Sequence, residues 1–324
     1  MHIVTGAAGF IGSAIVWKLN QLGVTDILVV DDLGRSEKWK NLVKLRFEDY
    51  IHKKDFLHLV VEKGEDPFGC ESIIHMGACS STTETDANYL MDNNYRYTQM
   101  VCRFALNNSI KFINASSAAT YGDGSLGFDD DLDRIESLRP LNMYGYTKQL
   151  FDLWAHRAKL FDHIVSLKFF NVFGPNEYHK GDMMSVVRKA FDQINQTGKL
   201  KLFKSYRKEY EDGGQQRDFV YVKDVVDVVA WLVEHPDVSG LFNVGCGQAR
   251  SWNELAEAVF RAMNKPVNVE YVDMPETLRE KYQYFTQAQM RRLKDAGYAK
   301  PFTSLEDAAA DYVQRHLMQA DQYL

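Results

Sequence analysis

The sequence has few cysteines, no long run of apolar residues and no excess of positive charge. Only four of its 324 residues are cysteine, and no two of them form a C-x-x-C pair, so neither a disulfide scaffold nor a cysteine-rich metal site is expected. The formal net charge of −6 argues against the broad positive field that nucleic acid attracts. No apolar stretch reaches membrane-spanning length, and a predicted strand occupies the place of a signal peptide. We therefore expect a cytoplasmic protein with free thiols.

The nine histidines are scattered and predict no metal site. His75 and Cys79 are four residues apart, but they fall across the end of a predicted strand over 72–75. We interpret His75 as a core residue whose ring nitrogens are satisfied by neighbours.

Three widely spaced glycines stand at a predicted strand-to-helix turn. Gly6-x-x-Gly9-x-x-Gly12 follows a β-prone run over 2–5 and precedes a helical apolar pattern over 10–19. Gly6 can adopt the angles of a tight turn, Gly9 lets main chain approach a pyrophosphate, and Gly12 lets the helix pack close to the strand. The arrangement predicts a dinucleotide site.

The second predicted strand, over 26–30, ends at an acidic residue. Asp31 follows the glycines by about twenty residues, where an acidic side chain accepts from the ribose hydroxyls and favours NAD. Arg35, Lys38 and Lys53 could instead reach a 2′-phosphate and favour NADP, or they belong to a solvated basic loop. Spacing alone leaves both coenzymes open.

A tyrosine and a lysine share one face of a predicted helix. Tyr144-x-x-x-Lys148 opens an amphipathic stretch, and residues four apart on a helix are neighbours. A lysine ammonium beside a phenol is expected to lower the pKa of the phenol and to suit it for acid/base work. A second match, Tyr50-x-x-x-Lys54, falls in a predicted short third strand without a glycine or serine partner, and we interpret it as coincidence.

A serine pair follows a strand predicted over 111–115. Ser116 and Ser117 would reach the carboxyl edge of a parallel sheet, where ligands of open α/β folds lie. Ser117 is our candidate for polarising a substrate oxygen. Together with Tyr144, Lys148 and the glycines, it predicts hydride transfer to a nicotinamide at a carbinol carbon.

The order of elements predicts an α/β fold with a doubly wound parallel sheet. Strands and helices alternate up to about Phe170, and the chain is long enough for a large domain with a smaller companion. A helix over 183–194 and a polar insert over 205–216 interrupt the order, after which a strand over 217–222, a helix and a strand over 241–245 return to it. We predict a Rossmann domain of residues 1–170 plus about 218–248, and a discontinuous α/β substrate domain of about 171–217 plus 249–324.

Four stretches carry a family resemblance: 76–84, 91–95, 115–122 and 177–181. The chain resembles the extended short-chain dehydrogenase/reductases throughout, and the last stretch is similar to the nucleotide-sugar epimerases that act on an ADP-activated heptose. The resemblance implies inversion at C6″ of ADP-D-glycero-D-manno-heptose, for the supply of lipopolysaccharide inner-core heptose. Hydride would pass to tightly bound NADP⁺, leave a transient ketone and return to the other face.

Residue roles follow from the same resemblance. Inversion needs proton transfer on two faces of the carbon, so Tyr144 would serve one face and Lys180 the other, provided that burial or a neighbouring cation lowers the pKa of Lys180. The implied cofactor contacts are Gly6, Gly9, Phe10, Ile11, Gly12, Asp31, Asp32, Lys38, Lys53, Met76, Gly77, Ala78, Cys79, Ser80, Asn93, Lys148 and Val172. The implied substrate contacts are Ser117, Asn171, Lys180, Asp182, Lys189, Phe203, Lys204, Ser205, Tyr206, Arg217 and Tyr282.

The match departs from the family at several positions. Asp182 stands where a serine is usual, Lys189 where a histidine is common and Met76 where a glutamate is usual, and the insert through Gln216 is long. The family favours NADP over NAD and suggests a homo-oligomer, a pentamer.

Three other functions stay open. A nucleotide-sugar 4-epimerase would share every catalytic residue except the Lys180 stretch. A 4,6-dehydratase needs an acid pair after the fifth strand, where Ser117-Ala118-Ala119 supplies none. A cofactor-sensing protein without turnover could dispense with Ser117, Tyr144 and Lys148.

Overall fold

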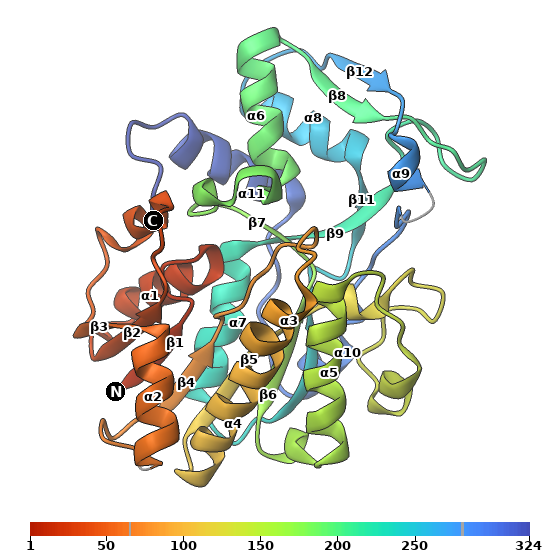
Figure 1. Ribbon diagram of the computed structural model, residues 1–324. Helices are drawn as coiled ribbons and strands as arrows, with labels where there is room; N and C mark the ends of the chain where they lie inside the picture. The colour runs from red at the N-terminus through yellow and green to blue at the C-terminus, as the bar shows by residue number, and fades with distance from the viewer. Residues whose placement is uncertain (65, 280–281) are drawn as a thin grey trace.

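A seven-stranded parallel sheet forms the centre of the computed structural model, which describes residues 1–64, 66–279 and 282–324 (Figure 1). Its strand order is β10-β6-β5-β4-β1-β2-β3, and every neighbouring pair is parallel. The strands are β1 (His2–Thr5), β2 (Ile27–Asp31), β3 (Asp49–His52), β4 (Ser72–His75), β5 (Lys111–Ser117), β6 (Val165–Phe169) and β10 (Gly240–Val244). The order reverses beside β1, so a switch point lies next to the glycine turn.

Helices cover both faces of this sheet because successive strand residues point to opposite sides. Ile3 packs with the helices α2 (Lys53–Lys63), α4 (Tyr97–Asn107) and α5 (Met143–Arg157), whereas the adjacent Val4 packs with α1 (Phe10–Gln21) and α7 (Val222–Glu234). Ile73 and Ile74 of β4 divide in the same way. The predicted doubly wound Rossmann-like fold is confirmed.

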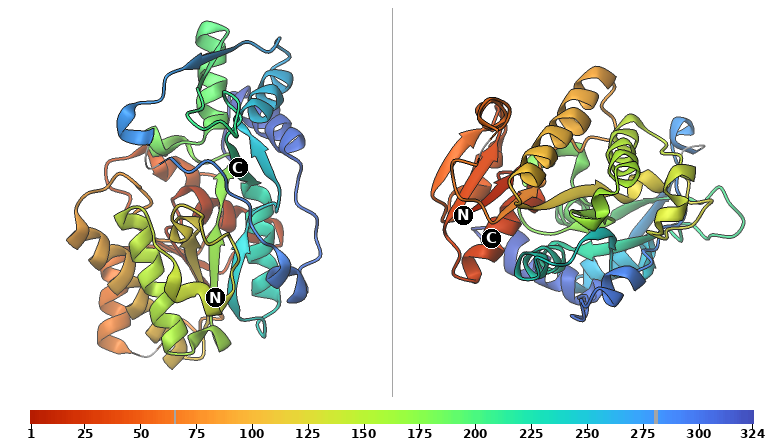
Figure 2. Two further views of the ribbon diagram at one scale, coloured as in Figure 1. Left: turned by 90° about the vertical axis from the view of Figure 1, so that its right-hand side faces the viewer. Right: turned by 90° about the horizontal axis from the view of Figure 1, so that it is seen from below.

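A second lobe stands above the carboxyl edge of the sheet (Figures 1 and 2). Three strands, β7 (Asn171–Phe173), β9 (Gln216–Tyr221) and β11 (Ala249–Ser251), form one small sheet in the order β11-β9-β7, and β8 (Leu200–Phe203) pairs with β12 (Val269–Val272) in another. The remaining helices are α3 (Ala87–Leu90), α6 (Val186–Thr197), α8 (Trp252–Ala262), α9 (Glu276–Arg279), α10 (Arg291–Asp295) and α11 (Leu305–Tyr312).

The late elements differ in detail from the sequence prediction. The helix predicted from Met183 begins only at Val186, because Ser185 accepts a hydrogen bond from the Arg188 N–H as its N-cap and the preceding turn bends at Gly181. The predicted return to the first sheet is observed, since β10 pairs with β6. The division into two discontinuous domains stays a prediction.

The helical segment that follows β4 contains one wider turn, with i→i+5 hydrogen bonds. A π-helical turn over Met91–Arg96 joins α3 to α4, and such turns mark functional regions in many helices.

Within the ranges that the structure describes, no helix is long and apolar enough to cross a membrane.

Candidate active site

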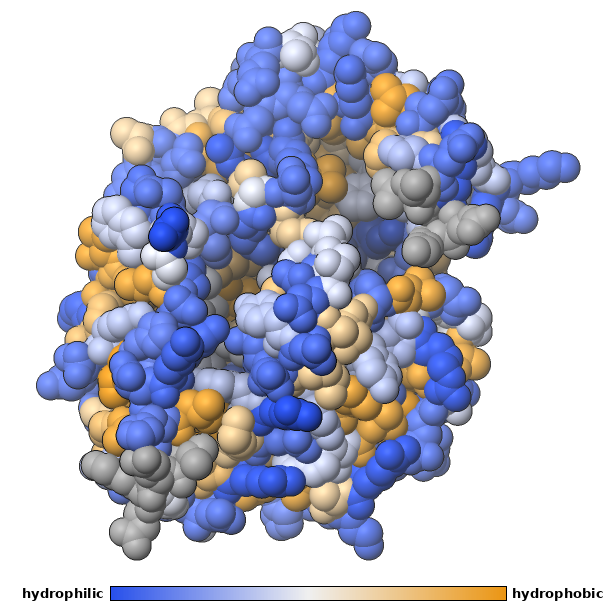
Figure 3. All heavy atoms as spheres, in the orientation of Figure 1, coloured by the Kyte–Doolittle hydropathy of each residue, from blue (hydrophilic) through white to orange (hydrophobic). Residues whose placement is uncertain are grey.

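A pocket of about 750 Å³ opens between the carboxyl edge of the central sheet and the second lobe. Its walls come from the glycine turn, from the ends of β2, β4, β5 and β6, from the first turns of α5 and from the segment 179–187. The space-filling view shows this face of the molecule hollowed between the two lobes (Figure 3). The volume is that of a ligand site.

The glycine turn leaves no room for side chains. Gly6 has φ +65°, and a Cβ there would lie 2.7 Å from the Gly77 nitrogen. A Cβ on Gly12 would lie 2.1 Å from the Gly6 oxygen. These are the tight turn and the close helix packing that the spacing predicts. The N–H groups of the first turn of α1 have no partners within the helix and suit a phosphate.

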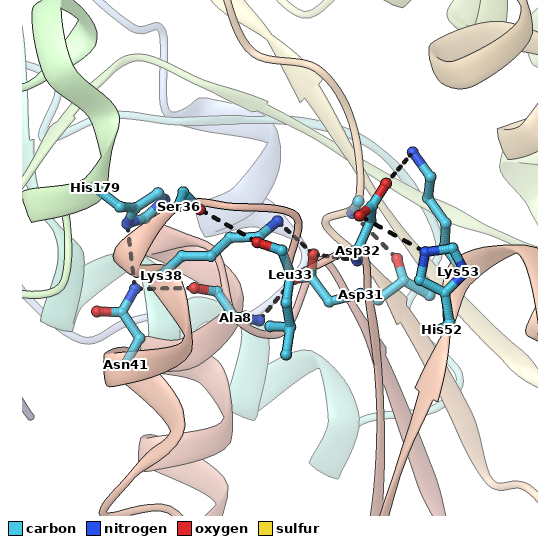
Figure 4. A network of polar contacts seen from close by, with 12 residues as sticks. Ala8, Asp31, Asp32, Leu33, Ser36, Lys38, Asn41, His52, Lys53 and His179 are labelled. Carbon is cyan, nitrogen blue, oxygen red and sulfur yellow. Dashed lines mark hydrogen bonds and ion pairs between the residues drawn. The ribbon is translucent and has the colours of Figure 1, made fainter.

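Two aspartate and lysine pairs form the next wall, at the end of β2 (Figure 4). Asp31 accepts from the Ala8 N–H at 2.7 Å and from Lys38 Nζ at 2.6 Å. Asp32 lies 3.3 Å from Lys53 Nζ, and this lysine lowers the pKa of Asp32 against the opposing effect of burial. Two cations therefore stand at the place where a ribose and its 2′-substituent would lie, each beside a carboxylate.

The π-helical turn supplies a third wall. Asn93 Oδ1 accepts from Lys53 Nζ at 3.1 Å. The buried Asn94 accepts from the Cys79 N–H at 2.8 Å and donates to the Cys79 carbonyl at 2.9 Å, which fixes the strand-end segment Met76–Ser80. Sequence reasoning selected Asn93 and missed Asn94, because the wider turn that places both asparagines here has no signature in the sequence.

His75 and the second tyrosine motif have structural roles. His75 is buried, with its ring nitrogens 2.7 Å from Thr5 Oγ1 and 3.0 Å from Thr98 Oγ1, and burial lowers its pKa to about 3. This is the satisfied core histidine that we expected. Tyr50 donates to the Asp31 carbonyl at 3.0 Å from β3 and does not line the pocket.

The catalytic candidates meet at the sheet edge. Asn142 caps α5 by accepting from the Gly145 N–H at 2.8 Å, so Tyr144 and Lys148 lie one turn apart on the pocket side. Lys148 Nζ donates to the Ala115 carbonyl at 2.6 Å, and Ser117 lies close enough to the Tyr144 phenol to lower its pKa in part. Ser117, Tyr144 and Lys148 therefore line one pocket.

The expected lowering of the tyrosine pKa is wrong for this structure. Burial raises the pKa of Tyr144, and the hydrogen bond from Ser117 offsets this only in part. Burial also lowers the pKa of Lys148 to about 8, against the raising effect of Asp152. The lysine ammonium is directed to the Ala115 carbonyl, and desolvation of the phenol is the largest effect on the pKa of Tyr144.

Lys180 reaches the same pocket from the second lobe. It lies on the short helical turn over Tyr178–Met183, with Nζ 5.3 Å from the centre of the Phe10 ring. Burial lowers the pKa of Lys180, although the nearby Glu177 raises it. The condition that we set for a lysine base, a pKa lowered by burial, is met.

The pocket gathers all of the predicted cofactor residues and only some of the predicted substrate residues. Every member of the predicted cofactor set lines it, as do Ser117, Tyr144, Asn171 and Lys180. Eight predicted substrate residues lie outside this lining: Asp182, Lys189, Phe203, Lys204, Ser205, Tyr206, Arg217 and Tyr282.

Several of these eight are engaged elsewhere. Lys189 Nζ donates to the Asp182 carbonyl at 2.6 Å, and Lys204 Nζ lies 3.1 Å from Asp273. The Ser205 N–H donates to Asp212 at 2.7 Å, and the exposed Tyr206 hydroxyl lies 3.2 Å from Asp273.

Arg217 stands in an aromatic frame beside the pocket. Its guanidinium lies 5.7 Å from the Trp252 ring and 5.2 Å from the Tyr282 ring, and Phe203 meets Tyr282 edge to face. Trp252 itself lines the pocket. A buried guanidinium can bind a diphosphate through two parallel hydrogen bonds, and the aromatic rings beside it can pack against a nucleotide base.

Sequence reasoning also missed lining residues from the second lobe. His179, Met183, Met184 and Trp252 all face the pocket. Trp252 could not be found, because it opens a helix far along the chain and an aromatic residue there fits a core helix equally well. His179 could have been found, since it precedes Lys180.

The walls suit a dinucleotide and give no sign of a metal. A Cβ on Gly6 or Gly12 would overlap the surrounding backbone, so only glycine builds this turn for a pyrophosphate. The Asp31–Lys38 and Asp32–Lys53 pairs stand at the end of the next strand, where an adenosine ribose would lie. No group of three or more histidine, cysteine, aspartate or glutamate side chains among the described residues could hold a metal ion.

The fold and the site define the class of Rossmann-fold enzymes that use a nicotinamide dinucleotide. The chain belongs to the NAD dependent epimerase/dehydratase family, whose model matches residues 2–245. It is 59% identical over 324 residues, all of both chains, to the ADP-L-glycero-D-manno-heptose-6-epimerase of Nitratidesulfovibrio vulgaris strain Hildenborough.

Solved structures share the fold. The Helicobacter pylori ADP-L-glycero-D-manno-heptose-6-epimerase is 26% identical with a TM-score of 0.79, covering 97% of this chain and 95% of that one. The UDP-N-acetylglucosamine 4-epimerase of Methanobrevibacter ruminantium is 24% identical with a TM-score of 0.80, covering 97% of this chain and 96% of that one. Fold similarity alone therefore does not separate a 6-epimerase from a 4-epimerase.

Proposed function

We propose that this protein inverts C6″ of ADP-D-glycero-D-manno-heptose to give the L-glycero epimer. The observation that carries the proposal is a pair of proton-transfer groups in one pocket, Tyr144 from the sheet lobe and Lys180 from the second lobe. Inversion requires such groups from two directions, because one group cannot serve both faces of a carbon. The full-length similarity to a 6-epimerase supports the choice of substrate.

Each catalytic residue has a defined task. Tyr144 moves the proton of the C6″ oxygen on one face and Lys180 on the other, while the Ser117 hydroxyl holds that oxygen. Lys148 fixes α5 to β5 through the Ala115 carbonyl, one helical turn from the phenol of Tyr144. When bound, NADP⁺ supplies a hydride acceptor that also returns the hydride, and its positive charge favours the phenolate of a nearby tyrosine. The substrate passes through a C6″ ketone and presents its other face before reduction.

The coenzyme proposed is NADP. Lys38 and Lys53 support this choice, because two fixed cations beside the ribose position suit a 2′-phosphate better than a second hydroxyl. Double substitution of Lys38 and Lys53 by methionine should weaken NADP⁺ binding much more than NAD⁺ binding. Equal losses for the two coenzymes would favour NAD.

The remaining proposed substrate contacts come from the second lobe. Arg217 and Tyr282 would hold the ADP moiety from the second lobe, together with Phe203 and the segment 204–206. The resemblance also leads us to propose a cytoplasmic protein that forms a homo-oligomer, a pentamer. Sedimentation of the purified protein tests the oligomeric state.

Substrate comparison tests the function. Purified protein is incubated separately with ADP-D-glycero-D-manno-heptose and with UDP-hexoses, and the products are identified by NMR. Formation of the C6″ epimer from the ADP-heptose alone supports the proposal. Inversion of C4″ in a UDP-hexose without action on the ADP-heptose would replace it with a 4-epimerase.

A further inference from the structure

We propose that Asn176 is a positioning residue that holds Lys180 at the reacting carbon, and this inference rests on the function proposed above. Asn176 lies four residues before Lys180, is fully buried and does not line the pocket. It also has φ +75°, a left-handed conformation that few residues other than glycine adopt. Its side chain and its backbone join three segments that are distant in the sequence.

The side chain of Asn176 bonds in two directions. Its Nδ2 donates to Ser13 Oγ at 2.9 Å, in the first turns of α1. Its Oδ1 accepts from the Leu324 N–H at 3.1 Å. Both partners are on segments outside the second-lobe loop that carries Lys180, so the side chain ties this loop to the coenzyme-binding lobe and to the segment 321–324.

A second buried asparagine strengthens the same connection. Asn41 Nδ2 donates to the Asn176 carbonyl at 3.0 Å and to the Ala8 carbonyl at 2.9 Å, and it lies 3.4 Å from His179 Nδ1. Figure 4 shows dashed lines from the Asn41 amide to Ala8 of the glycine turn and to His179. The loop before Lys180 is therefore held against the turn that we assign to the pyrophosphate.

The same turn of α1 meets Lys180 directly. Ser13 Oγ, the partner of Asn176, donates to the Phe10 carbonyl at 3.2 Å, and the Phe10 ring lies beneath the Lys180 ammonium. One helical turn thus receives both Asn176 and Lys180. Loss of the Asn176 side chain removes its bonds to Ser13 and Leu324, whereas the bond from Asn41 to the Asn176 backbone carbonyl remains.

The other side of the loop is fixed independently. Buried Glu177 accepts from the Ser185 hydroxyl at 2.7 Å, which holds the end of the loop at the N-cap of α6. Tyr178 donates to the Gln322 carbonyl at 2.7 Å. Removal of Asn176 therefore loosens the loop on the side of α1 without releasing it entirely.

The test is Asn176→Gly, because glycine keeps the left-handed backbone and removes only the side-chain bonds. Asn264→Gly is the matched control, since Asn264 is also left-handed, with φ +53°, and is exposed at the end of α8. Rates are counted per bound coenzyme, so any misfolded fraction does not enter.

The readout is the appearance of reduced nicotinamide in a single turnover with each C6″ epimer separately. Lys180→Met identifies the epimer whose oxidation depends on Lys180. With that epimer, Asn176→Gly should slow the reaction by at least about tenfold, because small misplacement of a catalytic group is costly. With the other epimer, and for Asn264→Gly with both, the rate should stay within about twofold of wild type.

Equal slowing with both epimers would overturn the inference and assign Asn176 a general structural role, and so would unchanged rates. If the wild-type protein does not act on either ADP-heptose epimer, the proposed function fails instead. The two failures are therefore distinct.

Discussion

At the scale of single residues, the tyrosine that we propose as catalytic is a buried, neutral phenol beside a serine. Burial raises the pKa of Tyr144 and the Ser117 hydroxyl opposes this, so without further positive charge the phenol stays protonated at neutral pH. A protonated phenol can donate to a ketone oxygen but cannot abstract a proton. Proton abstraction during oxidation of C6″ would need the positive charge of the oxidised coenzyme, which favours the phenolate. Hydride transfer would then neutralise this charge, so the phenol would be the favoured form for proton donation during reduction.

Replacement of the phenol hydroxyl tests this role. Tyr144→Phe should lower kcat by about 10²- to 10⁴-fold, the range of general acid/base catalysis, while coenzyme affinity is retained. Tyr146→Phe is the control, because Tyr146 is two residues along the same helix and 46% exposed. Steady-state rates and coenzyme titration measure the two effects. Comparable losses in both variants would assign Tyr144 a structural role.

Arg217 should act in binding and not in the chemical step. Arg217→Lys removes the planar guanidinium and its stacking between Trp252 and Tyr282. KM for the ADP-sugar should therefore rise about 10- to 100-fold with little change in kcat. This loss corresponds to the contribution of about 1.5–3 kcal/mol from a charged hydrogen bond. Arg103→Lys is the matched control, since Arg103 is an exposed arginine that stacks 5.4 Å from Trp154. An unchanged KM would remove Arg217 from the substrate site.

At the scale of elements, the glycine turn is the most constrained part of the site. Gly6→Ala should abolish coenzyme binding, because a Cβ would overlap the Met76–Gly77 backbone in addition to the cost of a positive φ. Gly23→Ala shares the positive φ, at +85°, but has no atom within 4 Å of the new Cβ. It should lose only about 1 kcal/mol of stability and keep its coenzyme affinity. Coenzyme titration and urea unfolding distinguish the two, and similar behaviour would show that steric overlap does not matter at Gly6.

Local patterns predicted those elements whose signals are contiguous in the chain. Each of these elements has a regular apolar pattern and a residue that marks where it begins or ends. They are the glycine turn, the helix of Tyr144 and Lys148, and the strand before Ser117, and all three are observed. The return of β10 to the first sheet followed from its apolar run alone. The helix start was placed three residues early, because Met183 and Met184 continue the apolar pattern that the Ser185 cap interrupts.

The substrate half of the site could not be predicted in the same way. Arg217, Trp252 and Tyr282 lie on a strand, a helix and a loop that meet only in three dimensions. The direction of the Tyr144 pKa could not be predicted either, because it depends on how deeply the phenol is buried. Sequence spacing places residues on a face but does not report their desolvation.

At the scale of the whole molecule, buried polar groups join the two lobes around the pocket. Asp218 on β9 accepts from the backbone N–H groups of Cys246, Gly247 and Ala288. It thus joins β9 to the segment after β10 and to the segment around residue 288. Asn176 and Asn41 make the corresponding connection on the other side. Such connections keep Tyr144 and Lys180, which belong to different lobes, in one pocket.

Acid should destabilise the folded protein through its buried histidine. The pKa of His75 is lowered to about 3 by burial, so between about pH 3 and its ordinary value near 6.5 the unfolded chain binds a proton that the folded protein does not. The stabilising effect is therefore complete above pH 6.5 and is lost as the pH falls. Lowering the pH from 7 to 5 should reduce the free energy of unfolding by about 2 kcal/mol from this residue alone.

Urea unfolding of wild type and His75→Gln at both pH values measures this difference. The variant lacks the titrating group, so its stability should depend less on pH by about the same 2 kcal/mol. Identical pH dependence in the two proteins would show that His75 is protonated when folded.

The route of the hydrogen at C6″ is decided by NMR of the reaction in deuterium oxide. Purified protein with its bound coenzyme is given ADP-D-glycero-D-manno-heptose, and the product is examined at C6″. If the hydrogen moves as a hydride between C6″ and the coenzyme and returns to the opposite face, the L-glycero epimer forms with hydrogen, not deuterium, at C6″. Deuterium at C6″ of the product, or no epimer at all, would contradict a hydride route served by Tyr144 and Lys180.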